Sequence, residues 1–307
     1  MKKSLAIVAV LIAIALTGCT PKVAKTTGNI SVYTRDASSG TRTAFFEFVS
    51  IVTATPLTAT AIEVTSAADM ATKVASDENG IGYTNMEIAV GNKDLLALNY
   101  NGVVASEANV LNGTYKLARP FNLVTRATGT FKSTQQEQVV LAFVDYLMNS
   151  TEGQEVVKSK GGIVEAGKST AWATLKAKYS VLSGDASAYT IKTGGSTSVE
   201  SSVKAALEAF KALTGVKFEM NQTGSGDGFK RTLGADKDSV NAVDIGFASR
   251  AFSATETVAA GAKSGTYCVD AIVVVVNAKN TVLTDASTEL IHNIYAGVTK
   301  TWDELAK

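Results

Sequence analysis

The sequence is poor in the residues that build metal sites and disulfide frameworks. Its 307 residues include one histidine, two cysteines and three prolines. So few histidines and cysteines exclude the common Cys/His metal clusters, and neither a metal nor a cofactor is expected. Lysine and arginine total 29 against 28 acidic residues, without the basic excess of nucleic-acid-binding proteins. With no low-complexity tract either, the composition is that of an ordered globular protein of about two domains.

The chain also lacks an apolar run long enough to cross a bilayer, because the run Leu5–Leu16 is too short. This run follows two lysines and precedes Leu16-Thr17-Gly18-Cys19, so residues 1–19 are expected to be an export signal. The last four of these residues resemble the bacterial lipobox. Lipid on Cys19 would hold the protein at a membrane surface, with residues 20–28 as a tether. A buried N-terminal helix is the alternative.

Beyond residue 28, short β-branched runs alternate with helical periods, which is typical of an α/β protein with mainly parallel sheets. The clearest segment spans residues 188–249. Its pattern predicts three strands, at 189–191, 216–220 and 242–247, each separated from the next by a loop and a helix. Thr197 and Glu200 have capping-box spacing, which predicts that the first helix starts at that loop.

The rest of the chain carries signals of the same kind. Between Asp270 and Asn277 every residue is apolar, which predicts a strand covered on both faces. Further strands are expected at 30–33 and from residue 80, and helices after residue 45, around 143–156, at 290–295 and at 302–305. No long period repeats, so a solenoid is not expected.

Glycine, serine and threonine gather in loops that follow predicted strands and precede predicted helices, at residues 38–41, 194–198 and 223–226. A helix N-terminus presents unpaired N–H groups and partial positive charge, so such a loop suits an oxyanion. Simple capping is the alternative for any one loop. In an open sheet the three loops and Ser249 would meet at the carboxyl ends of the strands. Arg35, which ends its strand, would add a planar fork of donors, unless it is a solvated surface residue.

Four segments resemble the signature segments of PstS-type phosphate-binding proteins, the extracytoplasmic receptors of phosphate ABC transporters. They are Arg35-Asp36-Ala37-Ser38-Ser39-Gly40-Thr41-Arg42, Gly195-Ser196-Thr197-Ser198-Val199, Thr223-Gly224-Ser225-Gly226-Asp227-Gly228 and Asp244-Ile245-Gly246-Phe247-Ala248-Ser249-Arg250. The resemblance implies the type II fold of the periplasmic binding protein superfamily. In this fold two α/β lobes, with two mainly parallel sheets and flanking helices, hold the anion between them.

The order of these segments differs from the usual order in the family, in which the segment with Arg35 follows the others. The chain therefore resembles a circular permutation, with residues 164–188 joining the ancestral termini. Two truncated tandem copies are the alternative. The resemblance implies one lobe built from residues 29–117 and 278–307 and a continuous lobe of residues 118–277. The two lobes would close around the ligand.

By position within the matching segments, the resemblance implies eight phosphate contacts: Arg35, Ser39, Gly40, Thr41, Thr197, Ser198, Ser225 and Ser249. Gly40 and Ser198 would offer backbone N–H groups, Arg35 its charge, and most of the others hydroxyl protons. Some family members have an acidic residue at the position of Ser249, which accepts the proton of hydrogen phosphate and repels sulfate. Ser249 therefore leaves selectivity against sulfate open. Asp36 and Asp227 are candidates to restore it, or else solvated or capping carboxylates, whereas Asp244 is expected to bond backbone.

The resemblance thus implies a lipid-anchored monomeric receptor, in the periplasm or at the cell surface, that captures inorganic phosphate and delivers it to an ABC permease. A receptor for sulfate or molybdate and a phosphate sensor without a permease are the alternatives. An enzyme is not expected, because the single histidine, His292, lies in an apolar helical stretch and no Gly-x-Ser-x-Gly elbow is present. Cys268 has apolar neighbours and is expected to be a buried, unreactive thiol.

Overall fold

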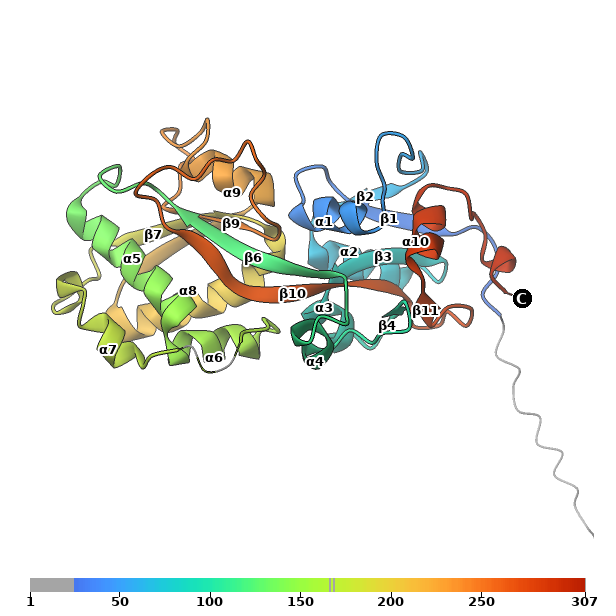
Figure 1. Ribbon diagram of the computed structural model, residues 1–307, viewed down its shortest axis with the longest axis horizontal. Helices are drawn as coiled ribbons and strands as arrows, with labels where there is room; N and C mark the ends of the chain where they lie inside the picture. The colour runs from blue at the N-terminus through green and yellow to red at the C-terminus, as the bar shows by residue number, and fades with distance from the viewer. Residues whose placement is uncertain (1–24, 166, 168, 307) are drawn as a thin grey trace, which may run out of the picture.

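The computed structural model describes residues 25–165, 167 and 169–306. The predicted export signal, its Cys19 and residues 20–24 of the predicted tether lie outside these residues. No helix in the described part of the chain is long and apolar enough to span a bilayer. The molecule is elongated, with two lobes side by side (Figure 1).

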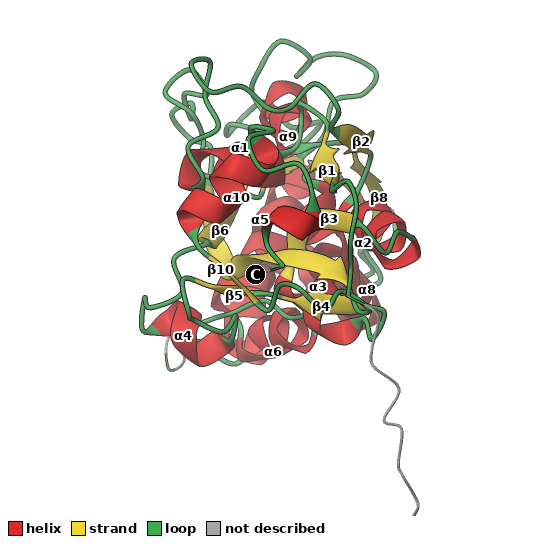
Figure 2. Cartoon of the chain, turned by 90° about the vertical axis from the view of Figure 1, so that its right-hand side faces the viewer, coloured by secondary structure: helices red, strands yellow, loops and turns green. Residues whose placement is uncertain are grey.

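The first lobe contains both ends of the described chain. Its strands are β1 (Ser31–Arg35), β2 (Ile62–Val64), β3 (Gly80–Asn85), β4 (Leu95–Ala97), β5 (Asn99–Tyr100) and β11 (Asp285–Ala286). Its helices are α1 (Gly40–Phe48), α2 (Ala67–Ser76), α3 (Met86–Gly91), α4 (Glu107–Leu111), α10 (Thr288–Tyr295) and the 3-10 helix η3 (Trp302–Glu304). Figure 2 shows this lobe end on, with helices on several sides of the strands.

The second lobe is built from the middle of the chain. Its strands are β6 (Ala118–Thr125), β7 (Thr190–Gly195), β8 (Lys217–Gln222), β9 (Ile245–Ala248) and the first part of β10 (Ser264–Asn277). Its helices are α5 (Thr134–Asn149), α6 (Thr151–Ser159), α7 (Trp172–Lys176), α8 (Glu200–Thr214), α9 (Ser225–Thr232) and the 3-10 helices η1 (Ser180–Leu182) and η2 (Thr197–Val199).

Serine side chains begin most of the longer helices. In six helices the N-cap serine accepts a hydrogen bond from the backbone N–H three residues later, at Ser39, Ser66, Ser106, Ser133, Ser150 and Ser287. Each such cap satisfies one of the N–H groups that a helix leaves unpaired, and is worth about 1 kcal/mol. Much of the hydroxyl content of the sequence therefore serves helix starts.

The two lobes share one hydrogen-bonded path of strands, in the order β2-β1-β3-β10-β6-β9-β7-β8. The predicted parallel groups are present as β2-β1-β3 in one lobe and β9-β7-β8 in the other. The antiparallel strands β10 and β6 join them. Each group has its own buried hydrophobic core. The two-lobed α/β architecture is therefore built on a mixed sheet that runs through both lobes.

Strand β10 passes from one lobe to the other. It pairs with β6 from Ser264 to Ala271 and with β3 from Ile272 to Val276. The apolar run 271–276 packs in the core of the first lobe. The lobe boundary after residue 277 stays a prediction.

The described end of the predicted tether lies against the folded lobe. The N–H of Thr26 donates to Thr281 Oγ1 at 3.1 Å, and the N–H of Gly28 donates to Asp303 Oδ2 at 2.7 Å. The segment 164–188, predicted to join ancestral termini, contributes Trp172 and Leu182 to the second core. The circular permutation itself remains a prediction.

Candidate functional site

Four strands end at the contact between the lobes, and three of them lead directly into a helix. Strand β1 leads into α1, β7 into η2 and α8, and β8 into α9, while Ser249 follows β9. Helices α1 and α9 face one another across the seam between the lobes (Figure 1). Because a helix N-terminus carries unpaired N–H groups and partial positive charge, this arrangement suits an anion.

Hydroxyl groups from both lobes meet at this seam. Thr41 Oγ1 lies 2.7 Å from Ser198 Oγ, and Ser38 Oγ donates to the carbonyl of Thr223 at 3.3 Å. Arg35 Nη2 donates to Thr197 Oγ1 at 3.1 Å. Each of these bonds joins a residue of the first lobe to a residue of the second lobe. The described conformation therefore has the lobes closed on one another.

A cluster of serines lies beneath the seam. Ser196 Oγ donates to Ser249 Oγ at 2.8 Å, Ser225 Oγ lies 3.3 Å from Ser249 Oγ, and the N–H of Ser249 donates to Ser225 Oγ at 3.0 Å. All three side chains are almost fully buried. Burying this many hydroxyls is tolerable only because they bond to one another or to a ligand.

Gly40 allows the two lobes to approach this closely. A Cβ atom at residue 40 would lie 2.8 Å from Ser225 Cβ and 2.9 Å from Ser249 Oγ. Any larger residue would push α1 away from the serine cluster. Ser39, beside it, caps α1 by accepting from the N–H of Arg42 at 3.3 Å, so its own hydroxyl hydrogen remains available.

Arg35 is the buried cation of the site, with 1% of its surface exposed. Its Nε donates to the carbonyl of Val64 at 3.3 Å, and its Nη2 donates to that of Thr65 at 3.0 Å. Its Nη1 is buried and has no hydrogen-bond partner within the described residues. A buried N–H without an acceptor is costly, so an oxyanion at this nitrogen would satisfy it.

A second buried arginine lies beside the site, and the sequence analysis missed it. Arg119 Nη2 and Nε both donate to Asp270 Oδ2, at 3.0 and 3.3 Å. Arg119 Nη1 donates to Thr41 Oγ1 at 2.6 Å. Burial lowers the pKa of Arg119 and raises that of Asp270, while the attraction between the two charges opposes both shifts. No sequence motif marks this pair, because its members stand 151 residues apart.

The helix start predicted at the loop with Thr197 is confirmed, but the capping box between Thr197 and Glu200 is not formed. Ser196 caps η2 instead, accepting from the N–H of Ser198 at 3.2 Å, and α8 begins at Glu200 without a side-chain cap. The hydroxyl of Thr197 instead accepts from Arg35 of the other lobe. The Ser198 N–H is therefore already paired within its own loop, and its hydroxyl is the group that meets Thr41.

The acidic residues near the seam have partners of their own. Asp36 Oδ1 accepts from the N–H of Ser38 at 2.9 Å, and its Oδ2 lies 3.3 Å from Arg35 Nη2. Partial burial acts to raise the pKa of Asp36, but bonds from Ser38 and the charge of Arg35 outweigh it and lower the pKa. Asp227 lies in the first turn of α9, where a carboxylate complements the helix dipole.

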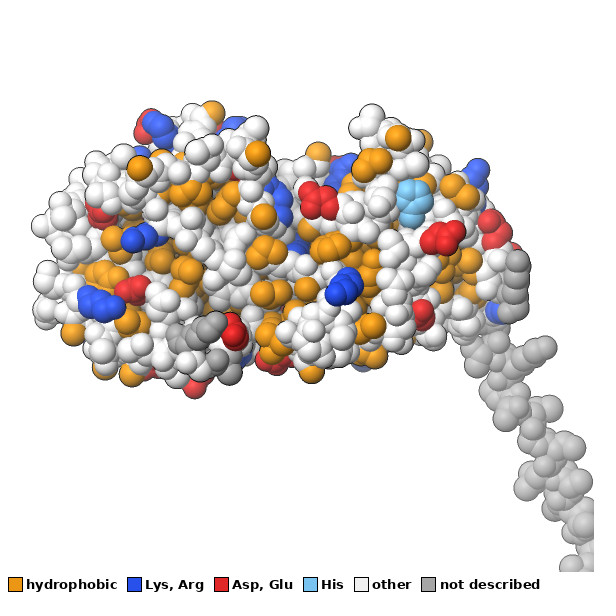
Figure 3. All heavy atoms as spheres, in the orientation of Figure 1, with side chains coloured by type: hydrophobic (Ala, Val, Ile, Leu, Met, Phe, Trp, Pro, Cys, Tyr) orange, Lys and Arg blue, Asp and Glu red, His pale blue; other side chains and the backbone are white. Residues whose placement is uncertain are grey.

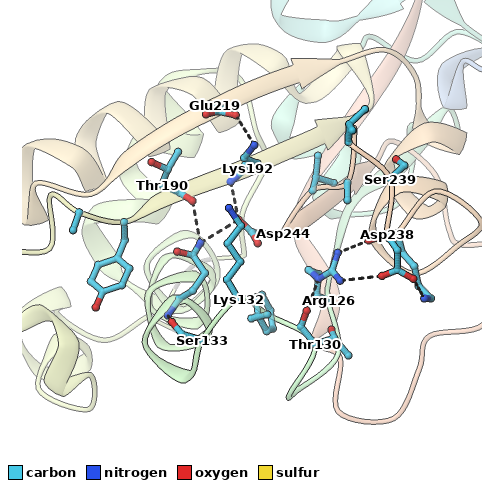
Figure 4. Close-up of a pocket in the computed structure, with 18 residues that line it drawn as sticks. Arg126, Thr130, Lys132, Ser133, Thr190, Lys192, Glu219, Asp238, Ser239 and Asp244 are labelled. Atoms are coloured by element: carbon cyan, nitrogen blue, oxygen red, sulfur yellow. Dashed lines mark hydrogen bonds and ion pairs between the residues drawn. The ribbon is translucent and has the colours of Figure 1, made fainter.

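A separate pocket of about 760 Å³ lies near the opposite ends of β7 and β9 (Figure 4). It contains none of the predicted phosphate contacts. Asp244 Oδ2 accepts from the backbone N–H of Lys192 at 2.9 Å and from Gln136 Nε2 at 3.2 Å, which confirms that Asp244 bonds backbone. Lys192 Nζ pairs with Glu219 at 3.0 Å, and Arg126 with Asp238 at 3.6 Å. The charges drawn in this pocket are thus largely paired.

The residues considered for catalysis and redox chemistry have structural contacts. His292, the pale blue side chain on the surface in Figure 3, is half-buried, and its Nδ1 lies 2.8 Å from the carbonyl of Val49. Cys268 is a buried free thiol whose pKa is raised by burial, as expected. Within the described residues, no group of three or more His, Cys, Asp or Glu side chains could hold a metal.

Comparisons with known proteins agree with this geometry. A family model described as the PBP superfamily domain matches residues 180–307. Over 303 residues the chain is 32% identical to phosphate-binding protein PstS 2 of Streptococcus agalactiae, covering 95% of this chain and 93% of that protein. The chain belongs to the PstS family of phosphate-binding proteins. Its identity to PstS 2 of Streptococcus pneumoniae is 30%, over 91% of this chain and 88% of that one.

A solved structure supports the same assignment. The phosphate-binding protein of a phosphate ABC transporter from Streptococcus pneumoniae matches this PstS-family chain with a TM-score of 0.66 and 28% identity. The match covers 91% of this chain and 100% of that chain. It confirms the predicted α/β fold of the periplasmic binding protein class. The relatives named here are binding proteins, not enzymes, by their names.

Proposed function

We propose that this protein captures inorganic phosphate between its two lobes and delivers it to an ABC permease in the cytoplasmic membrane. The relatives support this proposal, since they are named as phosphate-binding proteins, one of them of a phosphate ABC transporter. Lipid on Cys19 would keep the receptor at the membrane outside the cytoplasm, and we propose that it acts there as a monomer. Binding would stabilise the closed lobes.

The observation that carries the proposal is the buried Nη1 of Arg35, which has no partner among the described residues. Around it lie hydroxyls with a hydrogen to spare. Thr197 Oγ1 already accepts from Arg35, so its proton is free to point elsewhere. We propose that the eight predicted contacts, from Arg35 to Ser249, surround a tetrahedral oxyanion, with Arg35 supplying charge, Gly40 its backbone N–H and the serines and threonines their hydroxyls.

The site also supports a second ligand of the same class. Residue 249 is a serine, and its hydroxyl lies among the hydroxyls of Ser196 and Ser225. This position therefore has no carboxylate. A carboxylate would repel sulfate, whereas a hydroxyl does not. We therefore expect sulfate to compete with phosphate when it is present in large excess, and molybdate to be a further candidate.

The test is calorimetric titration of the purified chain with phosphate, before and after the substitution Arg35→Ala. We expect the affinity for phosphate to fall at least about tenfold, which is about 1.4 kcal/mol. The matched control is Arg126→Ala, which removes a guanidinium that pairs with Asp238 in the pocket of Figure 4. It should leave the affinity unchanged. Equal affinities in Arg35→Ala and the wild type would contradict the proposed site.

The transport role has its own test. If the protein serves a permease, deletion of its gene should abolish phosphate uptake at low external phosphate, and the wild-type gene should restore it. Uptake that persists while a phosphate response is lost would instead identify a sensor. Replacement of Cys19 by serine should release the protein from the membrane fraction if this residue carries the lipid.

A further inference from the structure

The buried ion pair Arg119–Asp270 lies on the two strands that run between the lobes. Arg119 stands near the start of β6, and Asp270 is its direct partner in β10. Two residues further, at Ile272, β10 leaves β6 and pairs with β3 of the first lobe. Both residues are only 2% exposed. The pair therefore fixes a guanidinium at the connection between the lobes.

The third nitrogen of this guanidinium reaches the candidate phosphate site. Arg119 Nη1 donates to Thr41 Oγ1, on α1 of the first lobe, at 2.6 Å. The same nitrogen lies 3.5 Å from the carbonyl oxygen of Ser249 in the second lobe. Asp270 holds the other two nitrogens, so the direction of Nη1 is set by the ion pair.

The protons of this cluster can be counted. A guanidinium only donates, so Thr41 must accept from Arg119, while a hydroxyl has one hydrogen and two lone pairs. Thr41 and Ser198 share one hydrogen bond at 2.7 Å, in which either can be the donor. In both arrangements one hydroxyl hydrogen of the pair is left over for a ligand, whether or not Arg119 is present. What Arg119 changes is the number of free acceptors, because the Thr41 lone pair that accepts from Arg119 cannot face the ligand.

We propose that Arg119 is a positioning residue for phosphate: fixed by Asp270, it occupies a lone pair of Thr41 and so favours the Thr41–Ser198 hydroxyl pair as a hydrogen-bond donor toward the bound oxyanion. This inference rests on the proposed function of the site. In this proposal Arg119 does not contact the anion itself. The donor hydroxyl of the Thr41–Ser198 pair would favour an unprotonated oxygen of the anion beside it.

The test is a double-mutant cycle with Thr41. The variant Arg119→Met/Asp270→Asn removes both charges together, because removing one alone would leave the other buried and unpaired. We expect this variant to bind phosphate about tenfold more weakly in calorimetric titration. In the Thr41→Val background, which lacks the hydroxyl, the same pair of changes should weaken binding less than about twofold.

Two further measurements separate positioning from a merely structural role. Circular dichroism and thermal unfolding without phosphate show whether each variant is folded. The matched control is Arg126→Met/Asp238→Asn, an arginine–aspartate pair in the pocket of Figure 4 whose aspartate is exposed, which should keep wild-type affinity. A structural role for Arg119 would weaken binding equally with and without the Thr41 hydroxyl, because the loss would not pass through Thr41.

The outcomes distinguish this inference from the proposed function. Wild-type affinity in Arg119→Met/Asp270→Asn, or an equal loss in the Thr41→Val background, overturns the inference alone. A folded wild-type chain that does not bind phosphate overturns the proposed function and this inference with it. A loss that disappears in the Thr41→Val background supports both.

Discussion

The second lobe carries polar residues at both ends of its parallel strands, and the two ends differ in kind. At the seam the groups are serine and threonine hydroxyls next to the guanidinium of Arg35 from the first lobe, whose Nη1 has no partner among the described residues. At the opposite end, in the pocket of Figure 4, the groups are charged and paired, as in Lys192–Glu219. Polar groups that are already paired with one another gain little from a ligand. A buried donor without an acceptor, in contrast, is stabilised when a ligand supplies the acceptor.

The two ends also differ in how the chain reaches them. Helices α1 and α9 and the start of α8 point their N-termini toward the seam, so the backbone adds positive potential there. The residues that line the pocket at the opposite end include the exposed Val240 and Ser133, the N-cap of α5, whose hydroxyl already accepts from the N–H of Gln136. The comparison teaches that helix direction and unpaired donors together, rather than pocket size, distinguish the candidate anion site from the opposite pocket.

The largest effect should come from filling the space between the lobes with an added methyl group at residue 40. In Gly40→Ala the new Cβ would lie 2.8 Å from Ser225 Cβ, so α1 cannot approach the serine cluster. Overpacking of this kind costs about 2 kcal/mol, and we expect phosphate affinity to fall about thirtyfold in calorimetry. The control Gly91→Ala, whose Cβ would meet nothing within 4 Å, should bind like the wild type. Unchanged affinity in Gly40→Ala would mean that phosphate binds with the lobes apart.

A smaller effect is expected from placing a carboxylate at residue 249, where the chain has a serine. In Ser249→Asp an acceptor would lie among the hydroxyls of Ser196 and Ser225. The carboxylate can accept the proton of hydrogen phosphate and repels sulfate, so the ratio of phosphate to sulfate affinity should rise about tenfold. Competition calorimetry of both anions measures this ratio. Ser249→Ala adds no charge and should leave the ratio near that of the wild type; a rise in this control would assign selectivity to another group.

Local sequence patterns predicted much of the fold and the composition of the seam. The apolar run before Asn277 predicted a strand, and the small hydroxyl loops lie after β1, β7 and β8 as expected. These features follow from neighbours in the chain, since periodicity and loop composition are local. Arg35 was identified because it ends a strand just before such a loop.

Features that depend on distant residues could not be predicted in the same way. The capping box at Thr197 failed because Ser196 caps the helix start, and the Thr197 hydroxyl meets Arg35 of the other lobe. The pair Arg119–Asp270 joins two strands that become neighbours only in the folded chain. Tertiary contacts thus decided which hydroxyls cap helices and which face the seam.

The smallest effect should come from Asp244, in the pocket at the opposite end of the second lobe. Burial raises the pKa of Asp244, although hydrogen bonds from Lys192 and Gln136 act to lower it. The folded chain therefore holds a proton on Asp244 at a pH at which the unfolded chain has lost it. The stability from this residue is complete below its unfolded pKa of about 4 and declines as the pH rises through the folded pKa. Asp244→Asn cannot titrate. The free energy of unfolding of the wild type relative to this variant, measured with urea, should therefore decrease as the pH rises above about 4. Phosphate affinity should stay the same in both proteins, and a difference in stability that grows with pH would show that Asp244 is stabilised as a carboxylate.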